Sequence, residues 1–250
     1  MKTFLKQAAA VRPTKRQLDW FDTSFYGFVH FGPNTFTNRE WGRGDEPEAV
    51  FHPTALDCDQ WVAAIKSAGM KAMVLTAKHH DGFCLWPSKY TEHSVKNSPF
   101  QGDVVRLAAD ACRRGGLKFG FYLSPWDRNS KYYGTPQYND YFCNQLTELL
   151  TEYGDIFCVW FDNACSPEMK GKQPYDFPRY FELIRKYQPN AVIFNDYGPD
   201  VRWCGNEAGD ARYAEWAVVP TELCRYAPVQ TGPGPLADCG TLEGIYNTDQ

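Results

Sequence analysis

Short, nearly continuous apolar runs alternate along this chain with segments whose apolar residues recur every three or four positions. Such runs are typical of strands buried on both faces, and the spaced segments are typical of amphipathic helices. We predict strands at 25–31, 71–78, 117–123, 156–161 and 191–194, with a weaker one at 214–217. Between them we predict helices at 57–69, 103–116, 136–153 and about 175–187. This alternation predicts an α/β fold with a parallel sheet.

The first four predicted strands share one feature, which is that each ends in residues suited to acid/base chemistry or sugar binding. These residues are His30, His79, His80, Tyr122, Trp160 and Asp162. Because the carboxyl ends of the strands form the catalytic face of a (β/α)8 barrel, we predict a TIM-type barrel. Five clear strands and one weak strand are fewer than eight, so we expect an incomplete barrel with about six of its eight units.

We interpret residues 1–250 as a single catalytic barrel domain that is truncated at the C-terminus, with residues 1–20 as a lead-in segment. Two connections, 32–50 and 81–99, are predicted to be long loops. Loops of this length are uncommon in a compact domain unless they have a function.

Composition narrows the classes of partner. The net charge of −4 is small and mixed in sign, which argues against nucleic acid or an anionic membrane surface as partner. The chain has no apolar stretch of membrane-spanning length and no apolar N-terminal signal, so we expect a cytoplasmic protein. Nine scattered cysteines without a Cys-x-x-Cys pair favour reduced thiols over a disulfide framework.

Asp162 is the leading candidate for a reacting group, since it ends an apolar strand beside Trp160. For a lone Asp at this place, the N-cap of a following helix is the favoured interpretation, and a second carboxylate is needed to change it. A second acid, Glu207, follows the strand at 191–194 in a glycine-containing loop suited to facing the same side. Two carboxylates about 5 to 5.5 Å apart perform retaining glycoside hydrolysis, one as nucleophile and the other as acid/base.

The histidines allow two hypotheses. His30, His79 and His80 could form part of a metal site, which would make the protein a metal-dependent hydrolase. However, adjacent residues of a strand point to opposite faces, so both His79 and His80 can bind one ion only if the strand is distorted. We favour neutral imidazoles that bind sugar hydroxyls, and we expect no metal and no other cofactor.

Taken together, five segments in chain order resemble the α-L-fucosidases of glycoside hydrolase family 29. They are 28–32, Glu40-Trp41, 78–83, the strand ending at Tyr122, and 160–162. The resemblance implies a (β/α)8-like barrel, a fucosylated oligosaccharide or glycoconjugate as substrate, and a retaining mechanism with Asp162 as nucleophile. It implies that the fucose is surrounded by His30, Glu40, Trp41, His79, His80, Tyr122, Trp160 and Arg202.

The acid/base varies within this family. Glu207 fits the pattern of the branch that prefers α-1,3 and α-1,4 fucosyl linkages, and Glu215 is the competing candidate. Family members continue through further barrel units and usually a C-terminal β-sandwich. A non-catalytic fucose-binding fragment is therefore the alternative to an active enzyme.

Overall fold

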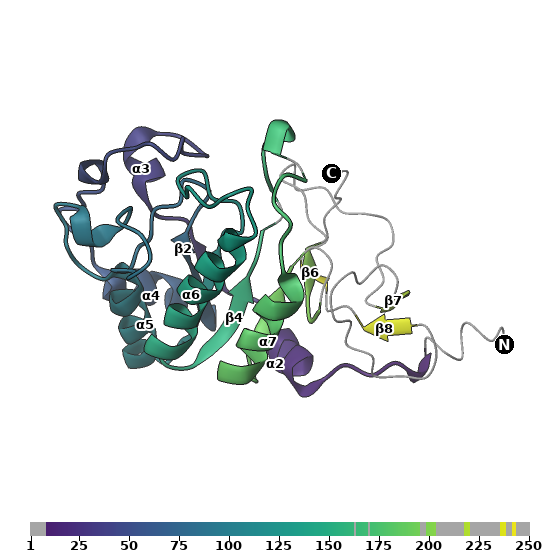
Figure 1. Cartoon of the computed structure of the whole chain (residues 1–250). Coiled ribbons are helices and arrows are strands. Elements are labelled where there is room, and N and C mark those ends of the chain that lie inside the picture. The colour runs from purple at the N-terminus through teal and green to yellow at the C-terminus, as the bar shows by residue number, and fades with distance from the viewer. Residues whose placement is uncertain are drawn as a thin grey trace. The chain divides into compact units, whose positions relative to one another are not determined.

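The computed structural model describes residues 9–162, 164–169, 171–195, 199–203, 218–220, 236–238 and 242–243. The chain divides into two compact units, one formed by Phe25–Ala191 and the other by Met1–Ser24 with Val192–Gln250. Figure 1 shows the elements of both units. The predicted site residues from His30 to Asp162 all belong to the unit Phe25–Ala191.

This unit is built on parallel strands in the order β1-β2-β3-β4. The strands are β1 (Gly27–Val29), β2 (Ala72–Lys78), β3 (Lys118–Leu123) and β4 (Ile156–Trp160). The helices that follow the strands are α4 (Cys58–Ser67), α5 (Val104–Gly115), α6 (Gln137–Glu152) and α7 (Phe177–Tyr187). Helices α4 and α5 pack on β2 and on each other, while α6 packs on α7. The predicted α/β fold with a parallel sheet is confirmed.

Local sequence determines where three of these helices begin. The side chains of Asp57, Asp103 and Asp176 each accept a hydrogen bond from a backbone N–H in the first turn of α4, α5 and α7. An N-cap of this kind satisfies a donor that would otherwise have no partner in the helix. Helix α5 is capped after Gly115 by Gly116, whose φ of 70° is the left-handed conformation that glycine adopts without strain. The predicted starts at Asp57 and Asp103 are thus confirmed.

The two long connections are more ordered than predicted. Segment 32–50 contains the short helix α3 (Pro33–Thr37) and the 3-10 helix η1 (Glu48–Val50), and segment 81–99 contains the 3-10 helix η2 (Val95–Asn97). Helix α3 begins with Pro33, which fits a first turn, and is capped after Thr37 by Asn38 in a left-handed conformation. Helices this short carry no periodic apolar pattern, which is why the sequence indicated loops.

The other unit contains α2 (Lys15–Thr23), β5 (Val192–Phe194) and four short strands. The short strands are β6 (Arg202–Trp203), β7 (Val218–Pro220), β8 (Leu236–Asp238) and β9 (Leu242–Glu243). Buried Asp200 joins α2 to β5, because its side chain accepts from the Ile193 backbone and its carbonyl accepts from Gln17. The predicted strand at 191–194 is confirmed, and that at 214–217 lies outside the described residues.

Two general features follow from the described residues. Their six cysteines, Cys58, Cys84, Cys112, Cys143, Cys158 and Cys165, are free thiols, as the sequence predicted. None of their helices combines the length and the hydrophobicity that crossing a bilayer requires.

The close approach of β3 and β4 gives a stability prediction. A Cβ added at Gly120 would lie 2.8 Å from the backbone oxygen of Cys158 on β4, so Gly120→Ala must push the two strands apart. We expect the free energy of unfolding to fall by about 1–3 kcal/mol, the usual cost of overpacking. Urea unfolding curves would measure the change.

Gly32→Ala is the matched control. At Gly32 no heavy atom of the described residues lies within 4 Å of the added Cβ, and its φ of 167° is extended. We expect it to change stability by less than about 0.5 kcal/mol. Equal losses in the two variants would refute the steric explanation.

Candidate active site

The predicted residues from the four strand ends lie together at one edge of the sheet. The rings of His30 and His79 are 4.5 Å apart, and the ring of His79 stacks at 5.7 Å on that of Tyr122. The ring of Tyr122 is in turn 6.3 Å from that of Trp160, which precedes Asp162 by two residues. Because the carboxyl ends of parallel strands share an edge, residues distant in sequence meet here.

Asp162 holds its carboxylate in a fixed position directly after β4. The Tyr122 hydroxyl donates to Oδ2 at 2.9 Å and the Ala164 backbone N–H donates to Oδ1 at 2.7 Å. The side chain keeps 33% of its surface exposed. The next long helix, α7, is capped by Asp176, so the structure does not use Asp162 as the N-cap of a long helix. The arrangement is that of an oriented and accessible carboxylate.

The hydrogen bonds of His80 determine which ring nitrogen carries the proton. His80 Nδ1 lies 2.6 Å from Ser124 Oγ, and the Ser124 hydroxyl donates to the Trp126 carbonyl at 2.6 Å. A serine has one hydroxyl proton, so Ser124 Oγ must accept its second bond from the N–H of His80 Nδ1. In neutral His80 the other nitrogen, Nε2, is then an acceptor, and it lies 3.9 Å from Asp162 Oδ2.

Burial keeps the three imidazoles neutral. Burial is the largest influence on each, and it lowers the pKa of His30, that of His79 to about 2 and that of His80 to about 3. Neighbouring histidines lower the last two pKa values further, while the charge of Glu40 opposes the lowering at His30. His79 Nδ1 is buried with no hydrogen-bond partner among the described residues. Neutral imidazoles can accept as well as donate hydrogen bonds, as binding of hydroxyl groups requires.

The expected separation of His79 and His80 onto opposite faces is wrong. Strand β2 ends at Lys78, and its register with β3 shifts between Thr76 and Lys78. Both histidines therefore lie beyond the pleated strand, and their rings are 4.1 Å apart. Nevertheless, within the described ranges no three His, Cys, Asp or Glu side chains are grouped as metal ligands. The metal-site hypothesis gains no support from these residues.

Trp126 forms an aromatic wall that the sequence analysis missed. Its ring lies 4.8 Å from that of His80 and 5.3 Å from that of the predicted residue Trp41, which is itself 5.5 Å from His80. Trp41 is partly exposed and Trp126 is buried. In the sequence, the feature that could have indicated Trp126 as a site residue is its position shortly after the strand that ends near Tyr122. Because adjacent loops at the sheet edge contact one another, that position favoured a place near the site.

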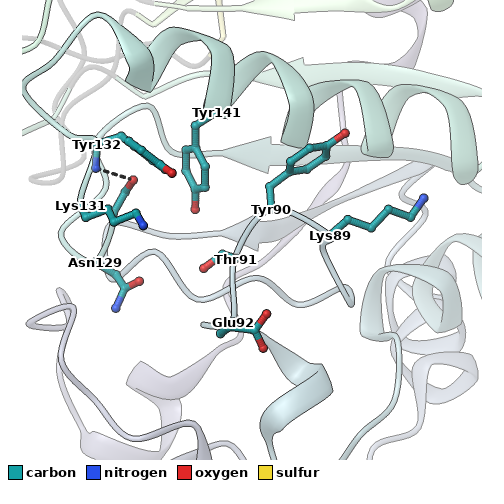
Figure 2. A pocket seen from close by; sticks show the side chains of 9 residues that line it. Lys89, Tyr90, Thr91, Glu92, Asn129, Lys131, Tyr132 and Tyr141 are labelled. Atoms are coloured by element: carbon teal, nitrogen blue, oxygen red, sulfur yellow. Dashed lines mark hydrogen bonds between the residues drawn. The ribbon is translucent and has the colours of Figure 1, made fainter.

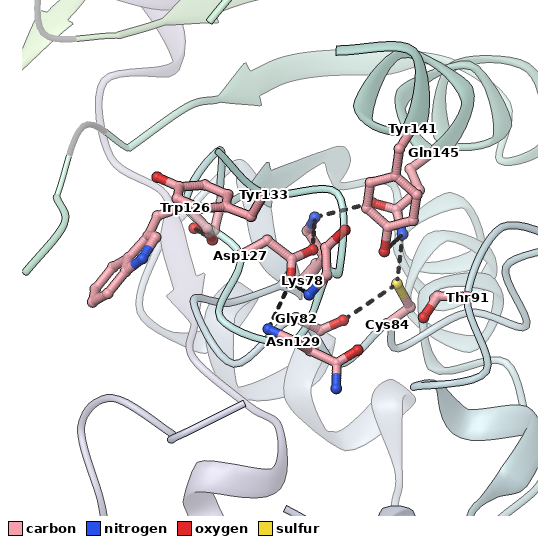
Figure 3. Close-up of polar contacts among 12 residues, drawn as sticks. Lys78, Gly82, Cys84, Thr91, Trp126, Asp127, Asn129, Tyr133, Tyr141 and Gln145 are labelled. Atoms are coloured by element: carbon pink, nitrogen blue, oxygen red, sulfur yellow. Dashed lines mark hydrogen bonds and ion pairs between the residues drawn. The ribbon is translucent and has the colours of Figure 1, made fainter. Parts of the chain in front are cut away.

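A buried ion pair connects the two strand ends that carry His80 and Ser124 (Figure 3). Lys78 Nζ lies 2.9 Å from Asp127 Oδ2, and both side chains are fully buried. Lys78 Nζ also donates to Gln145 Oε1 at 2.9 Å. This pair was not predicted from the sequence, although a lysine in an apolar strand was a signal, because a buried ammonium group needs an anionic or polar partner.

The loop after β3 is held by the same carboxylate. Asp127 Oδ1 accepts hydrogen bonds from the backbone N–H groups of Asn129 and Ser130, and the Arg128 N–H donates to the carbonyl of His80 at 2.9 Å. The loops after β2 and β3 are therefore joined through both side-chain and backbone contacts. This network fixes the position from which His80 faces Asp162.

Three predicted residues cannot be placed with this cluster. Arg202 belongs to β6 in the other unit, and its side chain lies outside the part of the chain that the structure describes. The two candidate acid/bases, Glu207 and Glu215, also lie outside the described residues. Glu40 is exposed in the loop that follows α3, and its charge acts on His30.

The amino-acid sequence of this chain is similar to those of known α-L-fucosidases. A sequence model of the family described as Alpha-L-fucosidase matches residues 8–207. The chain is 50% identical over 210 residues to Alpha-L-fucosidase 1 of Arabidopsis thaliana, and the match covers 82% of this chain and 41% of the plant protein. The chain thus spans less than half the length of this relative.

Solved structures of glycoside hydrolase family 29 proteins are also similar to this chain. A glycoside hydrolase 29 family member from an unknown rumen bacterium has a TM-score of 0.79 and 44% identity, covering 95% of this chain and 44% of its own. A family 29 fucosidase from Ruminococcus gnavus, solved in complex with fucose, has a TM-score of 0.79 and 32% identity, covering 92% and 52%. The chain belongs to the α-L-fucosidase family, glycoside hydrolase family 29.

Proposed function

We propose that this chain is part of an enzyme that releases terminal α-linked L-fucose from fucosylated oligosaccharides. The observation that carries the proposal is the oriented carboxylate of Asp162, held by Tyr122 beside a cluster of neutral histidines. Support also comes from the relative that was solved in complex with fucose. The four parallel strands β1 to β4 would form half of a (β/α)8 barrel whose catalytic edge carries these residues.

The proposed reaction is a double displacement. Asp162 attacks the anomeric carbon while Glu207 protonates the departing oxygen, and Glu207 then deprotonates a water that releases fucose with retained configuration. The hydrogen bonds from Tyr122 and from the Ala164 backbone fix the direction of the attacking carboxylate. Fixing this direction in advance lowers the barrier, because little orientational freedom remains to be lost at the transition state.

The neutral imidazoles would bind the sugar hydroxyls. With its proton on Nδ1, His80 presents Nε2 as an acceptor to a hydroxyl that can in turn donate elsewhere. Trp41 and Trp160, with rings packed on His80 and on Phe28, would cover the apolar faces of the deoxy sugar. Glu40 and Arg202 complete the proposed fucose site. The context of Glu207 favours α-1,3 and α-1,4 linkages.

Replacing the nucleophile tests the central assignment. Asp162→Ala, made in a chain extended to the length of family members, should lower turnover of an aryl α-fucoside by about 10⁴-fold or more, since no covalent intermediate can form. Asp155→Ala is the control, because Asp155 is an exposed acid next to the opposite end of β4. Turnover of the Asp162 variant within a few-fold of the parent would refute the assignment. A folded parent that binds fucose calorimetrically without turnover would instead support a non-catalytic fucose-binding protein.

The two acid/base candidates can be separated by chemical rescue. Glu207→Ala should lose activity on substrates with poor leaving groups, and azide should restore turnover of an aryl fucoside, because azide attacks the glycosyl intermediate without a general base. Glu215→Ala should show no such rescue. The reverse pattern would exchange the two assignments.

The hydrogen bond from His80 to Ser124 predicts an effect on sugar affinity. Ser124→Ala leaves the N–H of His80 Nδ1 without its acceptor, so the unbound variant shifts toward the tautomer with its proton on Nε2. Returning the proton to Nδ1, as acceptance of a sugar hydroxyl by Nε2 requires, then costs about 1–3 kcal/mol, and fucose should bind roughly tenfold more weakly or worse. The ¹⁵N chemical shifts of the imidazole should show protonated Nδ1 in the parent and a mixture of tautomers in the variant.

Ser98→Ala is the matched control, because Ser98 is also buried and its hydroxyl donates to the Val95 carbonyl. That variant should keep the fucose affinity of the parent. A parent in which Nε2 carries the proton would contradict the proposed orientation of the hydrogen bonds.

A further inference from the structure

A pocket separate from the fucose site lies between the loop after β2, the loop after β3 and helix α6 (Figure 2). Its volume is about 300 Å³, and none of its lining residues belongs to the cluster around Asp162. Three tyrosines, Tyr90, Tyr132 and Tyr141, contribute their side chains to its lining. All of these elements belong to the unit Phe25–Ala191.

Two of these tyrosines expose a large part of their side chains at the pocket, although the loops around them are polar. Tyr90 and Tyr132 are 43% and 38% exposed, whereas Tyr141 is only 7% exposed and lies behind Tyr132 with 5.9 Å between ring centroids. Figure 2 shows Tyr132 and Tyr141 close together, with Tyr90 on the far side of Tyr141 from Tyr132. Exposed aromatic rings at a concave surface favour a ligand with flat apolar faces.

The remaining lining is polar and carries little net charge. Thr91 Oγ1 accepts from the His93 N–H and Asn129 Nδ2 donates to the Gly44 carbonyl, so both side chains are held in fixed positions at the pocket. Lys131 holds its ammonium group 5.1 Å from the centroid of the Tyr132 ring. Two further charged lining residues, Lys89 and Glu92, already pair with Glu152 and Lys96. A purely apolar ligand would displace water from the ammonium group of Lys131 and from the remaining hydrogen-bonding capacity of Thr91 and Asn129, and a strongly charged ligand would make little use of the rings.

The backbone of both walls is held in place without a ligand. The Ser130 N–H is bound by buried Asp127, the Tyr132 N–H donates to Ser130 Oγ, and the Lys89 N–H donates to buried Glu148. A site that is formed in advance loses less conformational entropy on binding. A pyranose ring combines apolar C–H faces with hydroxyls at its rim, which matches tyrosine rings bordered by hydroxyl, amide and ammonium groups.

We propose that this pocket is a second carbohydrate-binding site, which takes a neutral pyranose unit other than fucose from a glycan. The choice of a glycan rests on the proposed function, since a glycan substrate brings such units to the protein. The same two loops begin at His79 and Ser124, so the chain itself ties this pocket to the fucose site.

Calorimetric titration with N-acetyllactosamine and with cellobiose, neither of which contains fucose, tests the proposal. We expect at least one of them to bind the parent with a Kd on the order of 1 mM, which is typical of a small contact area. Tyr132→Ala and Tyr90→Ala should each weaken binding by about tenfold, the loss expected when one stacking ring is removed. Tyr132→Phe should stay within about threefold of the parent, because it keeps the ring.

Leu107→Ala is the matched control, since Leu107 is 42% exposed on α5 and is not part of the pocket lining. It should bind the sugars as the parent does, and saturating L-fucose should not displace them. The proposal is overturned if neither sugar binds at about ten times the expected Kd, if both tyrosine-to-alanine variants bind like the parent, or if fucose competes. None of these outcomes would affect aryl α-fucoside turnover, so failure here is distinguishable from failure of the proposed function.

Discussion

The buried ion pair between Lys78 and Asp127 is the interaction on which the candidate site depends. Both groups are fully removed from water, which is costly unless each is closely paired and hydrogen-bonded. Lys78 is the last residue of β2 and Asp127 follows β3, so the pair can form only when these two strand ends are in one relative position. Removing one partner of a buried pair costs about 3–5 kcal/mol, which is enough to disfavour other arrangements of the two loops.

Because the ion pair fixes the two strand ends, it also fixes the orientation of His80 at the edge of the sheet. The His80 carbonyl is bound by the Arg128 N–H, and its ring is bound by Ser124, so neither the backbone nor the imidazole is free to turn. Burial beside other imidazoles then keeps His80 neutral. A neutral ring with one defined acceptor distinguishes hydroxyl positions better than a cation would, because a cation offers donors only.

The sequence was sufficient for features that depend on local patterns and insufficient for those that depend on distant pairs. The strands and Asp-capped helices were predictable because continuous apolar runs and N-caps act within a few residues. The Lys78–Asp127 pair joins residues 49 positions apart, and no local pattern selects that partner. The error over His79 and His80 has a different source, since the strand ends one residue before the pair and the rule of alternating faces no longer applies.

A parallel sheet also explains how one pair of loops can contribute both to the candidate active site and to the second pocket. At the beginnings of the loops after β2 and β3, the strand ends place Ser124 against one side of the His80 ring, whose other side faces Asp162. Further along the same loops, Tyr90 and Tyr132 face the second pocket. Asp127 lies between these positions and binds both the Lys78 ammonium group and the N–H groups of Asn129 and Ser130. The carboxylate that fixes the candidate active site is therefore also the one that supports a wall of the second pocket, and a fixed relation between the two places follows from that shared support.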